Sequence, residues 1–485
     1  MRTKSVVALI AAVAVLMPPA QSVAAQSVAA PAASPLQWGK CPAFDPPTVT
    51  QSECATLEVP LDYSAPDGAK IQLAVSRLSA ADPAKRRGVL LTNSGGPGGA
   101  GQRFPADLVD VGLPKSVRDT YDIIGFDPRG VGRSAPVTCD LTAEQNYSSI
   151  PPYARNAADV LQQANRSRQI ADQCGKSSTA ALLPHISTAN TARDMDTIRA
   201  ALGERKVSYL GISYGTYLGA VYATMFPQRT DRVVLDSSTG PDGWDFGFQR
   251  NLARGFEERF PDFAKYVAAR PQLGLGTTPR QVRAKYDALA ARLDRTTTAG
   301  RSDGALFRQA TFARLYYDKN FPELAGIWQA VDTGTPQRAA AAAAANDNYL
   351  ASQLHVLCND SRWPRSVLTY QVTVAIDRIR HPMFGAAAGG INACAFWPNR
   401  TPEHVRIDDH GPSNILIAQN LRDPATPLAG ARAMQAALGD RARMVTADQG
   451  GHLGYLFKDN RCLNDAVTTF LATGNRPHRD LNCKA

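Results

Sequence analysis

The sequence lacks most of the patterns that indicate a metal centre or a nucleic-acid site. Histidine occurs only seven times in 485 residues, and none of the eight cysteines forms a C-x-x-C pair or lies in a histidine-flanked cluster, so no metal site is predicted. The formal net charge is +10, but the Lys and Arg residues are scattered and form no long basic run. This distribution indicates a basic surface and not a nucleic-acid site.

Long apolar runs are missing except at the N-terminus. Residues 6–17 (VVALIAAVAVLM) follow Arg2 and Lys4, and the small residues 23–25 come soon after, as in a secretory signal. The run is shorter than the ~20 residues of a membrane span, and no later segment qualifies. We therefore expect residues 1–25 to direct secretion without stable membrane insertion, and residues 26–40 to form a mobile arm. An uncleaved anchor is the alternative.

Eight cysteines after an export signal are expected to be oxidised in pairs. The sequence does not fix the connectivity, because eight cysteines allow many pairings. Closure between nearest neighbours is the simplest arrangement, and it would give Cys41–Cys54, Cys139–Cys174, Cys358–Cys394 and Cys462–Cys483.

The rest of the chain is organised around Gly211-Ile212-Ser213-Tyr214-Gly215, a match to G-x-S-x-G. A buried strand is predicted before the motif, and apolar residues at helical spacing follow it. Where a strand turns sharply into a helix, side chains flanking the central serine would collide with backbone, so both flanking positions are glycine. We expect this turn to present Ser213 as a nucleophile. A serine in an ordinary glycine-rich loop is the alternative.

Strands alternate with helices over residues 41–239 and again over residues 411–485. Such alternation predicts a mostly parallel central sheet with functional side chains at the carboxyl ends of its strands. Residues 240–410 break the alternation and are predicted to be mainly helical, including the alanine run at 339–345. We interpret this segment as a large helical cap inserted into the core after the sixth predicted strand.

A glycine-rich loop at residues 92–101 follows the third predicted strand. No Gly-Lys-Ser/Thr follows it, so it is not a phosphate-binding loop. Its position is that of a loop that stabilises an oxyanion. We expect the backbone N–H of Tyr214 and one from Gly95 or Gly96, with Gly96 preferred, to serve as donors. A flexible turn is the alternative.

A nucleophilic serine needs a base and a carboxylate that orients the base. Among the histidines, only His452 lies in a glycine-rich loop after the last predicted strand. Two acids follow strands and could reach it, Asp423 and Asp236. Asp423 is preferred because Pro424 and Pro427 fix the course of its loop, whereas Asp236 lies directly before the cap.

Seven segments together resemble the secreted tripeptidyl aminopeptidases, relatives of proline iminopeptidase in the α/β-hydrolase clan. They are LTNSGGPGGAG, YDIIGFDPRGVGRS, GISYGTYLGAVYATMFPQRTDRVVLDSS, VLCNDSRWP, ACAFWP, QNLRDPATP and GGHLGY. The resemblance spans residues 41–483 and implies an α/β-hydrolase fold, cofactor-free release of short peptides from free N-termini, and a triad of Ser213, Asp423 and His452. NSGGPGG replaces the His-Gly-Gly-Pro-Gly of proline iminopeptidases, which argues against single-proline release.

An exopeptidase must also recognise the ammonium group of its substrate, and a carboxylate in the cap could do so. Glu257 and Glu258 are candidates because they lie near aromatic residues, although a solvated helix face is the more usual explanation for either one. Two other functions are compatible with the sequence. One is a secreted carboxylesterase or lipase in which the cap is a lid, and the other is a non-catalytic binding protein of the same fold.

Overall fold

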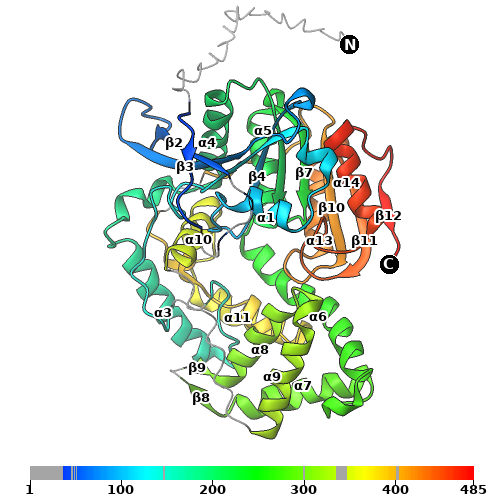
Figure 1. Cartoon of the computed structure of the whole chain (residues 1–485). Helices are drawn as coiled ribbons and strands as arrows, with labels where there is room; N and C mark the ends of the chain where they lie inside the picture. The colour runs from blue at the N-terminus through cyan, green and yellow to red at the C-terminus, as the bar shows by residue number, and fades with distance from the viewer. Residues whose placement is uncertain are drawn as a thin grey trace, which may run out of the picture.

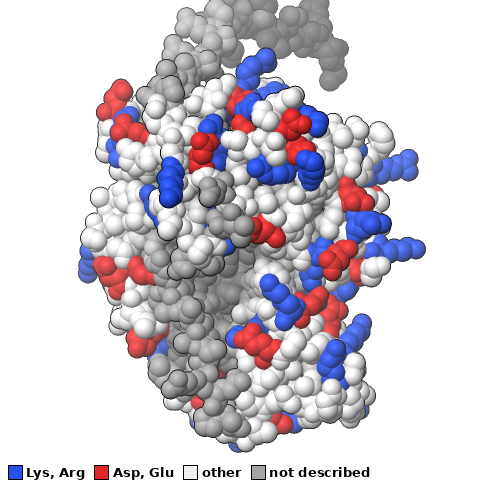
Figure 2. Space-filling view, in the orientation of Figure 1, with Lys and Arg blue, Asp and Glu red and all other residues white. Residues whose placement is uncertain are grey.

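The computed structural model describes residues 36–44, 47, 50, 52–145, 148–298, 301–334, 347–399 and 403–485. The predicted signal at 1–25, most of the predicted arm and the alanine run at 339–345 lie outside these residues. No helix among the described residues is long and apolar enough to cross a membrane. Lys and Arg are interspersed with Asp and Glu on the face seen in Figure 2.

A ten-stranded sheet forms the core, in the order β1-β2-β3-β5-β4-β6-β7-β10-β11-β12. The first three strands are antiparallel to their neighbours, and all the other pairs are parallel, so the predicted mostly parallel sheet is confirmed. The strands are β1 (Gly39–Lys40), β2 (Glu53–Pro60), β3 (Lys70–Leu78), β4 (Gly88–Asn93), β5 (Tyr121–Phe126), β6 (Val207–Ile212), β7 (Thr230–Asp236), β10 (Ile415–Arg422), β11 (Ala442–Gly450) and β12 (Leu481–Cys483).

Helices cover both faces of the sheet, because its parallel strands are apolar on both sides. Apolar side chains of α4 (Thr188–Ala201), α5 (Tyr214–Met225) and α13 (Leu428–Leu438) pack on one face. Those of α1 (Phe104–Asp110), α2 (Lys115–Arg118) and α14 (Arg461–Thr473) pack on the other. This three-layered core occupies the upper half of Figure 1.

The segment between β7 and β10 forms a helical body below the sheet (Figure 1). Its helices are α6 (Phe246–Ala268), α7 (Pro279–Leu293), α8 (Asp303–Arg314), α9 (Phe321–Thr333), α10 (Asp347–Asp360), α11 (Val367–Arg380) and α12 (Gly385–Ala388), with a small hairpin of β8 (Thr297–Thr298) and β9 (Arg301–Ser302). Except for α10, whose buried apolar residues join the cluster that packs on the sheet, these helices share an aromatic core built around Phe256, Phe260, Tyr286 and Trp328. The insertion follows β7. The two-residue β1 was not expected from the sequence, so β7 is the sixth of the predicted strands.

Helix α3 (Ala157–Cys174) also contributes to this helical body. Val160 and Ala164 of α3, together with Ile150 and Tyr153 just before it, belong to the same apolar cluster as the cap helices. From the sequence, these residues are expected to belong to the core segment 41–239. They cover cap surface instead of the sheet, because α3 packs against α11 and Gln309 of α8 donates to the carbonyl oxygen of Ile150 at 3.0 Å.

Four disulfides join Cys41–Cys54, Cys139–Cys174, Cys358–Cys394 and Cys462–Cys483. The nearest-neighbour pairing is thus confirmed, and no described cysteine is free. Each bridge fastens a local loop, and none links the sheet directly to a distant part of the cap.

A buried acid fixes the glycine-rich loop relative to the next strand end. Asp127, after β5, accepts the backbone N–H groups of Gly101 (2.9 Å) and Gln102 (3.0 Å) at one oxygen and that of Arg133 (2.9 Å) at the other. Nearby, the fully buried Arg129 pairs with Asp194 of α4 at 2.6 Å. The turn at 127–134 therefore has a structural role.

Candidate active site

Ser213 occupies a strained turn between β6 and α5. Its φ of 57° and ψ of −126° lie in a region that side-chain-bearing residues rarely adopt. A Cβ on Gly211 would lie 2.3 Å from the carbonyl oxygen of Gly215, and a Cβ on Gly215 would lie 2.8 Å from Asn93 Oδ1. Both positions therefore require glycine, as the sequence motif predicts.

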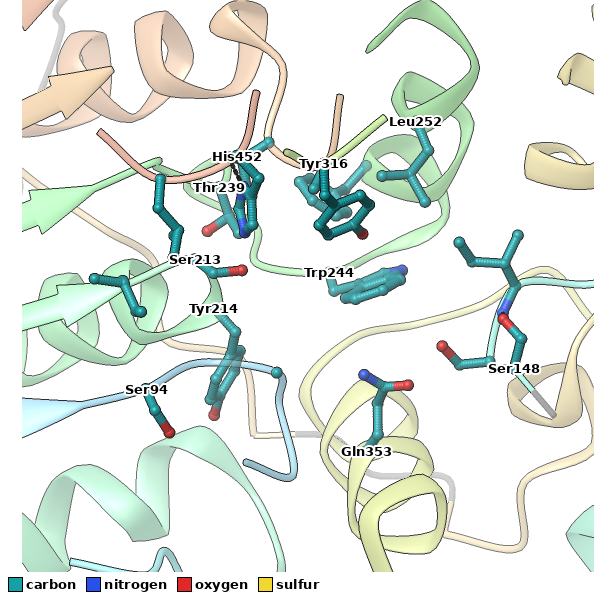
Figure 3. A pocket seen from close by; sticks show the side chains of 18 of the residues that line it. Ser94, Ser148, Ser213, Tyr214, Thr239, Trp244, Leu252, Tyr316, Gln353 and His452 are labelled. Carbon is teal, nitrogen blue, oxygen red and sulfur yellow. Dashed lines mark hydrogen bonds between the residues drawn. The ribbon is translucent and has the colours of Figure 1, made fainter. Parts of the chain in front are cut away.

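His452 and Asp423 meet at the carboxyl ends of neighbouring strands. Asp423 directly follows β10, and His452 follows β11 by two residues. The imidazole Nδ1 lies 3.0 Å from each carboxylate oxygen of Asp423. Figure 3 shows the other side of the ring turned toward the Ser213 hydroxyl. The structure thus brings together three residues that are far apart in the sequence.

Asp423 is fully buried and held in an ionised form. Burial alone would raise the pKa of its carboxyl group, but the neighbouring charge of His452 and the hydrogen bond from its imidazole act in the opposite direction. The backbone N–H groups of Thr426 and Ala425 donate to the same carboxylate at 2.9 Å each. The pKa of Asp423 consequently lies below its ordinary value.

The rival acid, Asp236, is engaged elsewhere. Its buried carboxylate accepts the backbone N–H groups of Gly454 (3.1 Å) and Tyr455 (3.0 Å), in the loop that carries His452. Burial raises the pKa of Asp236 to about 7. Asp236 therefore shapes the backbone beneath the histidine, whereas Asp423 contacts the imidazole itself.

The glycine-rich loop approaches the serine turn closely. A Cβ on Gly95 would lie 2.6 Å from the carbonyl oxygen of Ile212 and 3.0 Å from Ser213 Cβ. The N–H of Gly95 donates to Asn93 Oδ1 at 3.0 Å, so it is not free to bind an oxyanion. Gly96 and Tyr214 both line the cavity in front of Ser213. Tyr214 is the first residue of α5, where backbone N–H groups have no partner within the helix.

A cavity of about 340 Å³ lies over Ser213 and His452. Core loops form its floor. The cap forms its roof, with side chains from α6 and the segment before it, from the α8–α9 connection and from α10 (Figure 3). Ser148, Ser149 and Ile150 close one side, a contribution that the sequence did not indicate. The roof residues are Trp244, Phe248, Leu252, Tyr316, Tyr317, Tyr349, Leu350 and Gln353.

No Asp, Glu, Lys or Arg is among the described residues that line this cavity. Glu257 instead accepts the backbone N–H of Met383 (3.1 Å) and pairs with Arg283 (3.3 Å), and Glu258 pairs with Arg254 at 2.7 Å. The structure does not bring Glu257 or Glu258 to the cavity. Both lie on α6 but face neighbouring helices or solvent, so the expected carboxylate for the substrate ammonium is not found there.

Tyr316 links the cap to the histidine, and sequence reasoning missed it. The backbone N–H of His452 donates to the Tyr316 carbonyl oxygen at 2.7 Å. The two rings meet edge to face with centroids 5.2 Å apart. A loop tyrosine outside any motif has no signal that would have identified it.

Charged residues surround this link. Arg259 of α6 is buried and donates to the Leu315 carbonyl oxygen at 3.0 Å, next to Tyr316. It also pairs with Asp262 at 2.6 Å. Asp262 pairs in turn with Arg422 at 3.0 Å, the residue before Asp423. The cap is therefore tied by paired charges to the strand end that carries Asp423.

Among the described residues, no cluster of His, Cys, Asp and Glu could hold a metal ion.

Comparison with known proteins agrees with this arrangement. The family model described as TAP-like protein matches residues 381–483, the part that contains Asp423 and His452. Tripeptidyl aminopeptidase from Streptomyces lividans is 36% identical over 481 residues, which cover 95% of this chain and 88% of that protein.

Two further relatives have different names. Serine protease Hip1 from Mycobacterium tuberculosis is 29% identical and covers 93% of this chain and 91% of its own length. Carboxylesterase B from Mycobacterium tuberculosis is 30% identical, with 95% and 92% covered. With 36% identity to a tripeptidyl aminopeptidase over nearly its whole length, the chain belongs to the tripeptidyl aminopeptidase-like family of α/β hydrolases and is a serine peptidase.

Proposed function

We propose that this chain is a secreted exopeptidase that releases short peptides, chiefly tripeptides, from the free N-termini of peptides and proteins. Ser213, Asp423 and His452 act as its triad through an acyl-enzyme. The observation that carries the proposal is the Asp423–His452 pair at 3.0 Å beside Ser213, in a cavity roofed by the cap.

The proposed chemistry proceeds in two stages. In acylation, His452 takes the proton of the Ser213 hydroxyl as its oxygen attacks the scissile carbonyl carbon, and then gives that proton to the leaving amine. In deacylation, water is activated by the same imidazole and releases the peptide. Asp423, which is ionised and buried, keeps Nδ1 protonated and stabilises the imidazolium formed in each stage.

Negative charge develops on the carbonyl oxygen in both stages. We assign its stabilisation to the backbone N–H groups of Tyr214 and Gly96. The free N–H at the start of α5 and the position of Gly96 in the cavity wall support this assignment. Gly95 is not assigned this role, because its N–H already donates to Asn93.

In the proposed enzyme, neutral groups recognise the substrate ammonium, because no carboxylate is among the described residues that line the cavity. The cavity offers the Ser148 and Ser149 hydroxyls, the Gln353 side chain, and the ring faces of Trp244 and Tyr316. Hydrogen bonds from a charged donor contribute roughly 1.5–3 kcal/mol each, and ring faces attract cations as well. These contacts replace the hypothesis based on Glu257 and Glu258.

The cap explains why only short peptides would be released. It lies over Ser213 from several sides, so little of the substrate chain upstream of the scissile bond fits beneath it. We assign residues 240–410 to this cap, and residues 41–239 and 411–485 to the hydrolase core. Four disulfides fit an oxidising compartment and support export directed by residues 1–25.

A carboxylesterase is the second candidate. The uncharged lining of the cavity favours it, because an ester without an ammonium group needs no charged partner. Carboxylesterase B, one of the relatives, carries this activity in its name. The triad chemistry is the same in both cases, so only substrate preference separates them.

A substrate panel tests the proposal. It holds p-nitroanilides of one, two, three and four residues with free N-termini, beside p-nitrophenyl esters of increasing acyl length. The proposal predicts the highest kcat/KM for the tripeptide anilide and poor turnover of long acyl esters. Preference for esters over every peptide anilide would support the carboxylesterase. A serine-directed phosphonate should label Ser213 in either case.

A further inference from the structure

Helix α11 exposes an apolar stripe that nothing in the catalytic account uses. Leu368, Val372, Ile376 and Ile379 are 65%, 51%, 42% and 82% exposed. Their spacing of four, four and three residues places them on one side of the helix. Large aliphatic residues rarely gather on a water-exposed helix face without a partner.

The opposite side of α11 already has its packing partners. Tyr370, Thr373, Val374 and Asp377 are buried in the cap. The carboxylate of Asp377 is paired with Arg250 at 2.6 Å. The helix is therefore anchored to the cap by one face, and the exposed stripe is a second apolar face pointing away from it.

Positive charge flanks the stripe. On a helical projection, Arg378 lies beside one edge and Arg380 beside the other, and both are exposed. Neither forms an ion pair within the described residues. Arg362 and Arg365, just before the helix, are also exposed, whereas the acids between residues 360 and 380, Asp360 and Asp377, are buried.

We propose that this face of α11 docks the protein on an anionic lipid surface. An apolar stripe bordered by arginines suits the headgroup boundary of a bilayer, where aliphatic side chains enter the acyl region and guanidinium groups bind phosphates. The helix lies flat on the surface and does not span it, which agrees with the absence of a spanning helix among the described residues.

Other occupants fit less well. A stable protein–protein interface buries about 800 Å² on each partner, more than one stripe of four side chains provides. A second copy paired through α11 would bring the arginines of the two helices together in a parallel arrangement. In an antiparallel arrangement it would bring Arg378 and Arg380 near Arg365 of the other copy, and both arrangements set like charges against each other.

Vesicle co-sedimentation of the whole secreted protein tests the proposal. The probes are unilamellar vesicles of phosphatidylcholine alone and of phosphatidylcholine mixed with phosphatidylglycerol, at physiological salt. We expect binding to the mixed vesicles that is at least roughly tenfold tighter than to phosphatidylcholine, because arginines near an anionic surface strengthen binding by about fivefold each. Absence of binding to the mixed vesicles would overturn the proposal.

Two variants and their controls locate the surface. Leu368→Glu/Ile379→Glu and Arg378→Gln/Arg380→Gln should each weaken binding at least roughly tenfold, with unchanged hydrolysis of a small soluble substrate. Val111→Glu and Arg205→Gln/Lys206→Gln, which alter exposed residues of the core, should leave binding within about twofold.

Three outcomes contradict the assignment. Variants of α11 that bind like the unaltered protein would show that general positive charge, and not this face, causes the binding. A dimer that Leu368→Glu/Ile379→Glu dissociates, seen by sedimentation velocity, would identify a second copy as the occupant. A marked fall in Tm for that variant would indicate that another part of this chain covers the stripe.

Discussion

The backbone N–H of His452 donates to the carbonyl oxygen of Tyr316 at 2.7 Å, and the two rings pack edge to face. His452 belongs to the core and Tyr316 to the cap. His452 is therefore held by contacts from both parts. Asp423 binds its Nδ1, and Tyr316 contacts its backbone N–H and its ring. The cap, which roofs the cavity, also contacts a residue of the proposed triad.

Replacing the Tyr316 ring should reduce activity without unfolding the protein. Tyr316→Leu keeps the backbone hydrogen bond but removes the ring that restricts the imidazole, so we expect kcat to fall roughly tenfold, with KM changed less. Tyr316→Phe retains the ring and is the matched control, with kcat within about threefold. Equal kcat for the leucine variant and the unaltered protein would show that the ring does not orient His452.

The proposed triad gives a ranking of variants. Ser213→Ala and His452→Ala should each lower kcat by about 10⁴-fold or more, because the three groups act as a unit. Asp423→Asn should also cost several orders of magnitude, since the amide favours the wrong imidazole tautomer. Asp236→Asn should cost far less, because Asp236 binds backbone N–H groups and not the ring. If Asp236→Asn proves the more damaging of the two, Asp236 is the triad acid.

Asp236 should make stability depend on pH. Burial raises its pKa to about 7 from an ordinary value of 3.8, so the folded protein binds this proton more tightly than the unfolded chain does. Its contribution to folding is fully present below about pH 4 and is lost as pH rises toward 7. Asn mimics the protonated carboxyl. The Tm of Asp236→Asn relative to the unaltered protein should therefore rise between pH 4 and 7.

The control for this experiment is Asp440→Asn, which alters a carboxylate with a fully exposed side chain. Its Tm difference from the unaltered protein should stay flat over the same range. A flat difference for Asp236→Asn as well would mean that the raised pKa of Asp236 is not a property of the folded protein in solution.

The cysteines should all be oxidised. Thiol titration of denatured, unreduced protein should detect no free thiol, and peptide mapping should recover the four local pairs. Cys462→Ser/Cys483→Ser removes the bridge between α14 and β12 and should destabilise the fold by roughly 2–4 kcal/mol. A peptide that joins Cys41 to any cysteine other than Cys54 would contradict the pairing.

Much of the core could be predicted because its signals are local. The strands at residues 70–78 and 121–126 can be located from the sequence, since each is a continuous apolar or alternating run ended by turn residues. The serine turn was predicted for a similar reason, because steric limits at Gly211 and Gly215 act between neighbours in the sequence. The short strand β12 was missed, because three residues are too few to show a hydrophobic periodicity.

What the sequence did not reveal depends on contacts between distant segments. Tyr316 contacts His452 through its carbonyl oxygen, which every residue has, and through its ring, but an aromatic residue in a loop outside any motif does not point to such a contact. Ser148 and Ile150 line the cavity, and Gln309 of the cap, far away in the sequence, donates to the carbonyl oxygen of Ile150. Glu257 and Glu258 were plausible by composition, but their partners on other helices cannot be read from α6 alone.

The most direct test of the proposed exopeptidase compares one tripeptide p-nitroanilide with its N-acetylated form. Acetylation removes the ammonium charge and adds bulk at the end of the substrate that the cap must enclose. We predict that kcat/KM falls at least roughly tenfold for the acetylated substrate, while Ser213→Ala turns over neither. Equal kcat/KM for the free and acetylated tripeptides would contradict the account, because an enzyme that ignores the free N-terminus is not an aminopeptidase.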